Sequence, residues 1–341
     1  MQGPIVIAGT EIRGGQRVTI DIPFARLYTH TDMTMPVHVI HGKKPGPRLF
    51  ISAAIHGDEI NGVEIIRRLL KLRLLNKLRG TLIAIPVVNA YGFINHSRYL
   101  PDGRDLNRFF PGNSKGSLTS QLASLFMDEI VSKCTHGIDM HTGSRHRNNL
   151  PQIRADLSLE ENETLASAFG APVVIDARLR DGSLREAASE IKIPLLLYEA
   201  GEALRFNDMA IKMGIKGIIS VMRKIGNLPP RMAQGKRQME PLLARSTKWT
   251  RAPISGIVQS AMQLGTKVEK GDVVAVVGDP FGESEENVVA SSGGVLIGRL
   301  NLPLVHRGDA LFNIASVDMP DDMENALEII DLPSDGDYDI M

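Results

Sequence analysis

The pattern of apolar and polar residues divides the chain into a central α/β part and flanking parts rich in strands. Between residues 48 and 225, short apolar runs alternate with segments whose apolar residues recur at helical spacing. This alternation predicts an α/β fold, a mixed but largely parallel sheet flanked by helices. The predicted strands are 48–55, 81–89, 136–141, 172–175 and 194–199, and the predicted helices are 59–75, 119–133, 158–169, 184–191 and 207–225.

The flanking segments differ in residue pattern and composition, which indicates further domain boundaries. Residues 1–47 alternate apolar and polar positions, so we expect an N-terminal β segment that joins the α/β part at 48–225. Residues 226–245 contain Pro229-Pro230 and several basic residues, as is typical of a linker. Residues 246–316 are short strands broken by glycines. The tail 317–341 holds nine acids and neither Lys nor Arg, and we expect its end to be mobile because like charges repel.

A weak internal repeat runs through residues 246–316. The segments 252–258 and 265–274 are echoed by 290–296 and 303–311. This pattern resembles the biotinyl/lipoyl-type barrel-sandwich domain, in which a lysine on the hairpin between the two halves carries the cofactor. The corresponding hairpin, 279–287, has no lysine. We therefore expect a small all-β domain that bears no prosthetic group and could cap a ligand site in the α/β part.

Composition and charge limit the function classes. Of the 341 residues 43% are hydrophobic, enough for a full core and for two domains or one with an appendage. The formal net charge is zero, so electrostatics gives no case for a nucleic acid or membrane partner. A single cysteine, Cys134, excludes an internal disulfide and is expected to be a core thiol. We find no transmembrane run and no signal peptide, so a cytoplasmic protein is expected; a homo-oligomer is left open.

The first candidate for chemistry follows the strand at 48–55, where the chain reads His56-Gly57-Asp58-Glu59. In open α/β sheets, ligands bind at the carboxyl ends of strands. His56 and Glu59 are three residues apart, so one turn can aim an imidazole and a carboxylate at one point. Zinc accepts such ligands, although a polar loop with a helix-capping acid explains this short motif equally well.

Two further strand ends carry candidate groups. His141 lies in Asp139-Met140-His141-Thr142-Gly143, and Glu199 ends the apolar run 194–199. Two histidines and a glutamate form the ligand set of catalytic zinc hydrolases. A carboxylate at the same sheet edge could accept a proton from the attacking water. For Glu199, the alternative is a surface acid at the end of a strand.

The loop after the strand at 81–89 adds positive charge. Arg98, Arg104 and Arg108 fall within eleven residues, among turn-forming residues. Guanidinium groups bind carboxylates in a two-pronged geometry, so this loop suits an anionic ligand. A solvated surface loop is the alternative.

Together these residues resemble the succinylglutamate desuccinylase/aspartoacylase family of the zinc carboxypeptidase clan. The resemblance covers roughly residues 45–225, in the family's order. It is carried by the segments His56–Glu59, Val88–Phe93, Arg98, Asp105–Gly112, Asp139–Gly143 and Glu199–Gly201.

The resemblance implies a zinc carboxypeptidase-like fold and a role for each matching residue. His56, Glu59 and His141 would hold one zinc ion per chain, and Glu199 would be the general base and then the acid. Arg98 would polarise the scissile carbonyl, and Asn107 with Arg108 would bind a substrate carboxylate. Some members use a further arginine shortly before the catalytic Glu. The nearest candidate here is Arg185, but its spacing does not match closely, and an exposed helix arginine is the alternative.

These observations favour a zinc-dependent amidohydrolase that removes an acyl group from a small N-acyl amino acid or related amine. A zinc carboxypeptidase acting on peptides is the first alternative, because the same metal site would serve. A non-catalytic metal-binding protein is the second, against which Glu199 and Arg98 argue. The sequence leaves open the acyl group, the amine and the oligomeric state.

Overall fold

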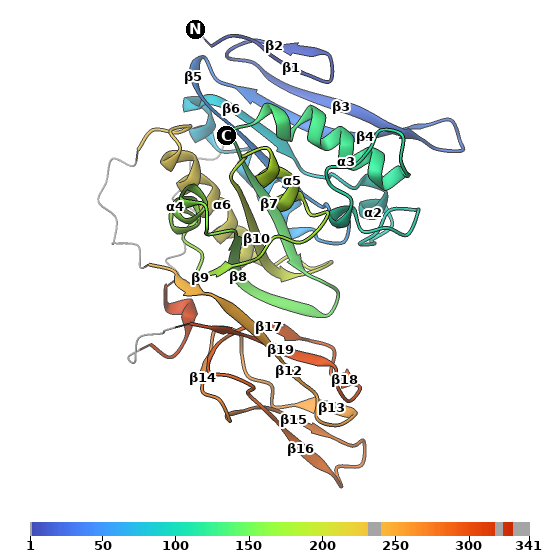
Figure 1. Ribbon diagram of the computed structural model, residues 1–341, viewed down its shortest axis with the longest axis vertical. Coiled ribbons are helices and arrows are strands. Elements are labelled where there is room, and N and C mark those ends of the chain that lie inside the picture. Colours follow the sequence, from blue (N-terminus) through green and yellow to red (C-terminus); the bar gives the residue numbers. More distant parts are fainter. Residues whose placement is uncertain (1, 231–239, 318–322, 330–341) are drawn as a thin grey trace.

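A large mixed sheet flanked by helices forms the body of the protein, and an all-β region follows it at the C-terminal end (Figure 1). The structure is a computed structural model that describes residues 2–230, 240–317 and 323–329. Most of the tail predicted to be mobile lies outside the described residues. Among the described residues, no helix has the length and apolar character needed to cross a membrane.

The large sheet has the strand order β12-β19-β17-β8-β10-β7-β5-β6-β4-β3. Its centre, β6-β5-β7-β10, is parallel, as the alternation of strands and helices predicts. Antiparallel strands extend it on both sides. The strands of the body are β1 Ile5–Ile7, β2 Thr10–Ile12, β3 Arg17–Arg26, β4 Asp32–His41, β5 Lys44–Ala53, β6 Arg79–Ile85, β7 His136–Gly143, β8 Arg147–Ala155, β9 Val173–Asp176, β10 Leu195–Glu202 and β11 Leu242–Ala244.

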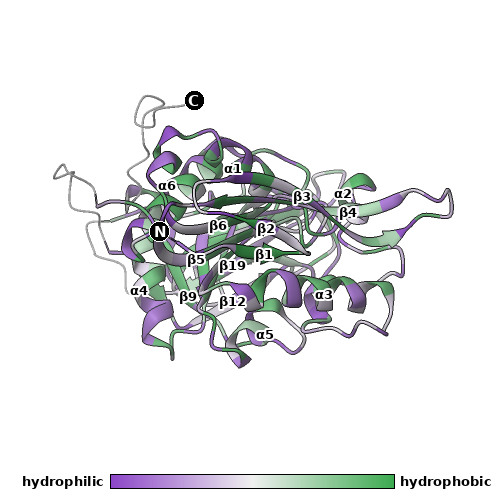
Figure 2. Cartoon of the chain, turned by 90° about the horizontal axis from the view of Figure 1, so that it is seen from above, coloured by the Kyte–Doolittle hydropathy of each residue, from purple (hydrophilic) through white to green (hydrophobic). Residues whose placement is uncertain are grey.

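Helices cover both faces of this sheet. Figure 2 shows α1 and α6 on one side and α3 and α5 on the other. The α-helices are α1 Asn61–Leu69, α2 Ala90–Ile94, α3 Leu118–Glu129, α4 Glu160–Phe169, α5 Leu184–Glu190 and α6 Asp208–Lys224, and the 3₁₀ helices are η1 Arg73–Lys77, η2 Leu106–Arg108, η3 Val131–Lys133 and η4 Ala326–Ile329.

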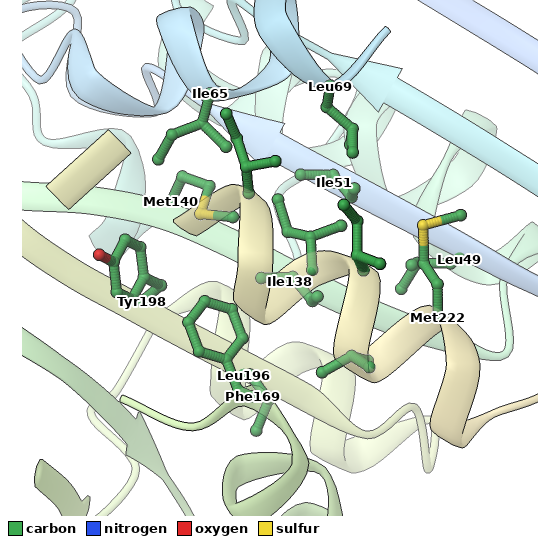
Figure 3. Packing of buried hydrophobic residues seen from close by; sticks show 14 of the residues in the cluster. Leu49, Ile51, Ile65, Leu69, Ile138, Met140, Phe169, Leu196, Tyr198 and Met222 are labelled. Atoms are coloured by element: carbon green, nitrogen blue, oxygen red, sulfur yellow. The ribbon is translucent and has the colours of Figure 1, made fainter. Parts of the chain in front are cut away.

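The main core lies between the sheet and the helices α1, α4 and α6 (Figure 3). Successive side chains along a strand point to opposite faces of the sheet. Ile51, Ile138 and Leu196 are on the face that packs against α6. All three are fully buried, and burying one such side chain stabilises the fold by about 1.5–3 kcal/mol. The other face packs on α3 and α5, where Cys134 is buried as expected.

The all-β region continues the large sheet. Its strands are β12 Ser246–Arg251, β13 Gly256–Gln259, β14 Lys267–Val268, β15 Val273–Gly278, β16 Glu285–Val289, β17 Gly294–Leu300, β18 Leu304–Val305 and β19 Ala310–Ser316. β17 pairs with β8 of the large sheet. The strands β16-β15-β13-β18 form a second sheet, and this region has its own hydrophobic core. The lysine-free segment Asp279–Asn287 includes the turn between β15 and β16.

Several local predictions differ from the structure. The helix predicted at 59–75 begins only at Asn61 and ends at Leu69, before the separate 3₁₀ helix η1. Strand β8 was not predicted at all. In the segment 226–245, which was predicted to be a linker, β11 pairs with β9 in parallel; residues 231–239 lie outside the described residues.

Candidate active site

Neighbouring parallel strands bring the candidate residues to one edge of the sheet. In the register of β7 and β10, His141 lies directly opposite Glu199, and Asp139 lies opposite Leu197. Directly paired residues point to the same face, so His141 and Glu199 share the face on which α5 lies. His56 and Glu59 come from the turn after β5, the strand on the other side of β7.

Gly57 allows this turn to approach a neighbouring segment. A Cβ atom at Gly57 would lie 2.0 Å from the carbonyl carbon of Gly92, so only glycine fits there. The backbone N–H of Glu59 donates to the carbonyl of His56, with an N···O distance of 3.0 Å. Glu59 therefore sits in a tight turn before α1, and not on the first helical turn as predicted.

His56, Glu59 and His141 form a buried cluster that could hold a metal ion. Their potential ligand atoms all lie within 4.8 Å of one another. The Nδ1 atoms of His56 and His141 lie 2.8 and 2.7 Å from the two carboxylate oxygens of Glu59. Two imidazole nitrogens and one carboxylate therefore converge, the donor set that catalytic zinc sites use.

Two aspartates orient the histidine rings. Asp105 Oδ1 lies 3.0 Å from His56 Nε2, and Asp139 Oδ2 lies 2.7 Å from His141 Nε2. Asp139 is itself held by the hydroxyl of Ser52 at 2.7 Å. A carboxylate on Nε2 fixes the tautomer that leaves Nδ1 free to bind a metal. Sequence reasoning assigned these aspartates no role, although Asp139 precedes His141 by two positions and so points to the same face of the strand.

The charges of the cluster suit a cation at its centre. Burial alone would raise the pKa of Glu59, but the imidazoles of His56 and His141 outweigh it and lower the pKa well below its usual range. Burial opposes a charge on His141, yet Asp139 and Glu59 raise its pKa well above the ordinary value. The cluster attracts positive charge, and a metal ion can supply it in place of protons. The donor set therefore fits the metal that the sequence predicts.

Arg98 lies against the cluster. Its Nη1 atom is 3.1 Å from Glu59 Oε1, and its Nη2 atom is 2.9 Å from Asp105 Oδ2. Its side chain is 27% exposed and lines the cavity described below. A guanidinium in this position can reach a carbonyl oxygen bound beside the cluster.

Asn107 and Arg108 line the same cavity. The side-chain oxygen of Asn107 accepts a hydrogen bond of 2.9 Å from the backbone N–H of Leu184, which ties η2 to the start of α5. Arg108 Nη1 donates to the carbonyl of Asn107. The loop that was predicted to bind an anion is therefore anchored beside the metal-ligand cluster.

Glu199 is paired with an arginine that sequence reasoning missed. Arg154 Nε lies 2.5 Å from Glu199 Oε2, but the pair does not have hydrogen-bond geometry. The two residues come from adjacent antiparallel strands, with Arg154 opposite Leu197. Because β8 contains Asn148-Asn149 and Pro151, its sequence lacks a clear strand pattern, and nothing in it singled out Arg154.

Arg185 also lines the cavity, on α5. It is 8% exposed, so the alternative of an exposed helix arginine is wrong. Its guanidinium donates to the carbonyls of Ala177 and Arg178 at 2.9 and 3.1 Å. Burial, together with the nearby guanidinium groups of Arg154 and Arg180, lowers the pKa of Arg185 to about 10.

All these groups surround one cavity of about 540 Å³. The C-terminal region closes part of it with Thr247, Trp249 and Asn313, and the guanidinium of Arg147 lies 4.9 Å from the centre of the Trp249 ring. Six arginines line the cavity, against three carboxylates, and this excess of positive charge favours an anionic ligand. The arginines are Arg98, Arg108, Arg147, Arg154, Arg180 and Arg185, and the carboxylates are Glu59, Asp139 and Glu199.

Comparison with known proteins finds relatives that share the fold of this chain or much of its sequence. An N-alpha-acetyl-L-2,4-diaminobutyric acid deacetylase of Halomonas elongata is 26% identical over 302 residues, which cover 83% of this chain and 86% of that protein. The ectoine utilization protein EutE of Ruegeria pomeroyi, solved with product bound, has the same fold, with a TM-score of 0.79 at 23% identity over 92% of this chain and 98% of that one.

A succinylglutamate desuccinylase of Silicibacter sp. TM1040 superposes with a TM-score of 0.78 at 25% identity, covering 93% of this chain and 98% of that one. The model of the succinylglutamate desuccinylase/aspartoacylase catalytic domain matches residues 45–225, more than half of the chain and almost the range of the sequence resemblance. The chain therefore belongs to the succinylglutamate desuccinylase/aspartoacylase family, whose members are deacylating hydrolases.

Proposed function

We propose that this protein is a zinc-dependent hydrolase that removes the acyl group from a small N-acyl amino acid or related amine. One observation carries the proposal: the metal-ligand cluster His56–Glu59–His141 and the carboxylate of Glu199 face one cavity that is rich in arginine. A metal ion held by the cluster can activate water, Glu199 can move a proton, and the arginines can hold an anionic substrate.

His56, Glu59 and His141 would hold the zinc ion through two Nδ1 atoms and one carboxylate. When bound, zinc supplies Lewis-acid chemistry and lowers the pKa of a coordinated water toward ~7. Asp105 and Asp139 keep both imidazoles in the orientation that this requires. The buried position of the cluster makes each of these electrostatic interactions stronger than it would be in water.

Glu199 would act as the proton shuttle. It stands opposite His141 in the sheet and faces the cavity, so it can accept a proton from the attacking water and deliver it to the nitrogen of the leaving amine. Arg98, beside Glu59, would stabilise the negative charge that develops on the carbonyl oxygen. Proton transfer is thus assigned to the carboxylate of Glu199, and stabilisation of the carbonyl oxygen to the guanidinium of Arg98.

Arg108 and Asn107 would bind the carboxylate of the amino acid. The position of Arg108 on the wall of the cavity, close to the cluster, supports this assignment. A charge-assisted contact of this kind contributes roughly 1.5–3 kcal/mol to binding.

The closed side of the cavity favours a small substrate over a peptide. Residues of β12 and β19 close one side of the cavity, whereas a carboxypeptidase needs an open groove for the rest of the chain. The Halomonas elongata relative, a deacetylase of an acetylated diamino acid, supports the same class of substrate. The C-terminal region would thus act as a cap.

A substrate screen tests the proposal. The zinc-loaded protein is incubated with a panel of N-acyl amino acids and with peptides, and the free amine is measured. We expect release from at least one acyl amino acid at a rate well above that from peptides, and a ~10²–10⁴-fold lower rate in the Glu199→Gln variant. Preferential cleavage of peptides would establish the carboxypeptidase alternative.

A further inference from the structure

A second and larger pocket lies at the opposite end of the sheet from the candidate active site. Its volume is about 870 Å³, against about 540 Å³ for the active-site cavity, and the two share no lining residue. The first residues of β5 and β6, the end of β4 and the chain that follows α6 line it. β5 runs from Lys44 at this pocket to Ala53, shortly before His56, so at ~3.3 Å per residue the two sites are about 30 Å apart along the strand.

The charge of this pocket is strongly positive. Six cationic side chains line it, and no carboxylate from the part of the chain that the structure describes does so. The chain as a whole has 39 basic and 39 acidic residues, so this is a local excess. The next part of the sequence, 231–239, holds three more basic residues and no acid, and cannot balance the charge. The six are Arg17, Lys43, Lys44, Lys77, Arg79 and Arg223.

Close backbone contacts hold the segments that carry these side chains. A Cβ atom at Gly42 would lie 2.4 Å from the carbonyl oxygen of Leu78, so only glycine fits there. The backbone N–H of Gly42 donates to the carbonyl of Gly80, with an N···O distance of 2.8 Å. The turn before β5 is thus fixed against the start of β6, and the cations are gathered by the fold itself.

Two of the cations are neighbours in the sheet. Lys44 on β5 lies directly opposite Arg79 on β6 in the parallel register. Like charges placed opposite each other in a sheet repel and destabilise it. An anion bound beside both side chains removes this repulsion, so the pocket is suited to a negatively charged ligand.

The floor of the pocket is apolar. The buried side chains of Ile40, Leu75, Leu78 and Leu228 line it. A concave, largely apolar surface with a few charged groups at its edge is typical of small-molecule sites, whose volumes are about 300–1,000 Å³. The shape of the pocket therefore favours a small ligand over a nucleic acid, which follows an extended basic surface.

The kinds of cation indicate phosphate and not carboxylate. Arginines and no lysine line the active-site cavity, whereas three of the six cations here are lysines. The flat guanidinium fork matches a carboxylate, while the ammonium group of lysine acts as a point charge and binds phosphate oxygens from any direction. Six positive charges also exceed what one singly charged anion can balance.

We propose that this pocket is a binding site for a small phosphate compound with at least two negative charges. Lys43, Lys44, Lys77 and Arg79 hold the phosphate groups, and the apolar floor contacts the uncharged part of the ligand. The site is remote from the metal-ligand cluster, so this inference is independent of the proposed hydrolase activity.

Calorimetric titration of the full chain tests the class of ligand. ADP and inorganic pyrophosphate are the probes, and tricarballylate is the carboxylate control, all at 0.15 M ionic strength because salt screens surface charges. We expect saturable binding of one phosphate probe per chain, with tricarballylate at least ~10-fold weaker. Saturable binding of neither phosphate probe, equal affinity for tricarballylate, or tighter binding of a short DNA duplex would overturn the inference.

The Lys43→Gln/Lys77→Gln variant tests the location of the site. Both side chains are exposed, so the variant should fold, and it should bind the phosphate probe at least ~10-fold more weakly because two charge-assisted contacts are lost. The matched control is Lys192→Gln/Lys270→Gln, which changes the net charge equally at exposed positions outside both pockets and should keep the affinity. Full affinity in the first variant would place the anion elsewhere, and equal loss in the control would show a non-specific charge effect; either result would overturn the inference.

Thermal unfolding provides a readout that separates ligand binding from a structural role. A saturating phosphate probe should raise the Tm of the parent protein, because it binds the folded state, and should raise that of the Lys43→Gln/Lys77→Gln variant much less. Without ligand, the Tm of this variant should equal or exceed that of the parent, since two repelling charges are removed. A clear fall in the Tm without ligand would show that the lysines stabilise the fold themselves, and would overturn the inference.

Discussion

At the scale of residues, the site depends on pairs of side chains that fix one another. The histidines of the cluster are each held between Glu59 and a second carboxylate, and Glu199 is held by Arg154. These pairings leave the two imidazole Nδ1 atoms directed at one point. The chemistry of the site thus follows from contacts between residues that are 2 to 82 positions apart.

Glu199→Gln is expected to keep the metal and to lose most turnover, because the amide cannot accept or deliver the proton. General acid–base catalysis contributes ~10²–10⁴-fold, and we expect a loss of that order in kcat. Glu202→Gln is the control, since Glu202 lies on the same strand but accepts hydrogen bonds from His146 and Asn301. Near-normal kcat in Glu199→Gln would assign the shuttle to another group.

Arg108→Lys keeps the positive charge but loses the two-pronged geometry, so KM should rise while kcat changes little. The matched control is Arg104→Lys in the same loop, where the arginine pairs with Asp102 outside the cavity. Steady-state kinetics on an N-acyl amino acid and on the corresponding acyl amine without the carboxylate measures the effect. Similar KM values for the two substrates would count against a carboxylate site at Arg108.

At the scale of elements, the sequence predicts much of the central sheet, because its strands are continuous apolar runs. It also predicts His56, Glu59, His141 and Glu199 as strand-end residues, and the structure brings all four to one cavity. It does not predict β8, whose polar residues and proline lack a strand pattern. Arg154 was missed for this reason: its position beside Glu199 depends on β8 pairing with β10.

Helix α1, which follows the metal-binding turn, contains an ion-pair network with a predictable pH dependence. Hydrogen bonds from Arg67, together with those from Arg68, lower the pKa of Glu64 to about 2, despite its burial. A carboxyl group whose pKa is lower in the folded state stabilises the fold above its unfolded pKa of about 4.5. That contribution is lost as the pH falls from about 4.5 towards 2.

Comparison of urea unfolding at several pH values tests this. Glu64→Gln should lower the free energy of unfolding at pH 7 and should reduce its decrease between pH 5 and about 2. The same acid dependence in Glu64→Gln and in the parent protein would show that other carboxylates are responsible.

At the scale of the whole molecule, the all-β region shares a sheet with the catalytic part and completes the cavity. The pairing of β17 with β8 makes the two parts continuous, and β12 and β19 supply one wall. Substrate selection is therefore expected to depend on residues outside the segment 45–225 that matches the family.

Trp249→Ala tests this at the wall of the cavity. Removing the ring takes away the surface against which Arg147 packs and widens the cavity on the side of the C-terminal region. The ratio of kcat/KM for short peptides to that for N-acyl amino acids should rise. An unchanged ratio in the folded variant would argue against a cap.

Metal analysis of the purified protein tests the central claim most directly. The parent protein should contain one zinc ion per chain, and the folded His56→Ala/His141→Ala double variant should contain none. A His38→Ala/His306→Ala double variant, which changes two histidines outside the cluster, should keep the full zinc content. A full equivalent of zinc in the folded His56→Ala/His141→Ala variant would contradict the account.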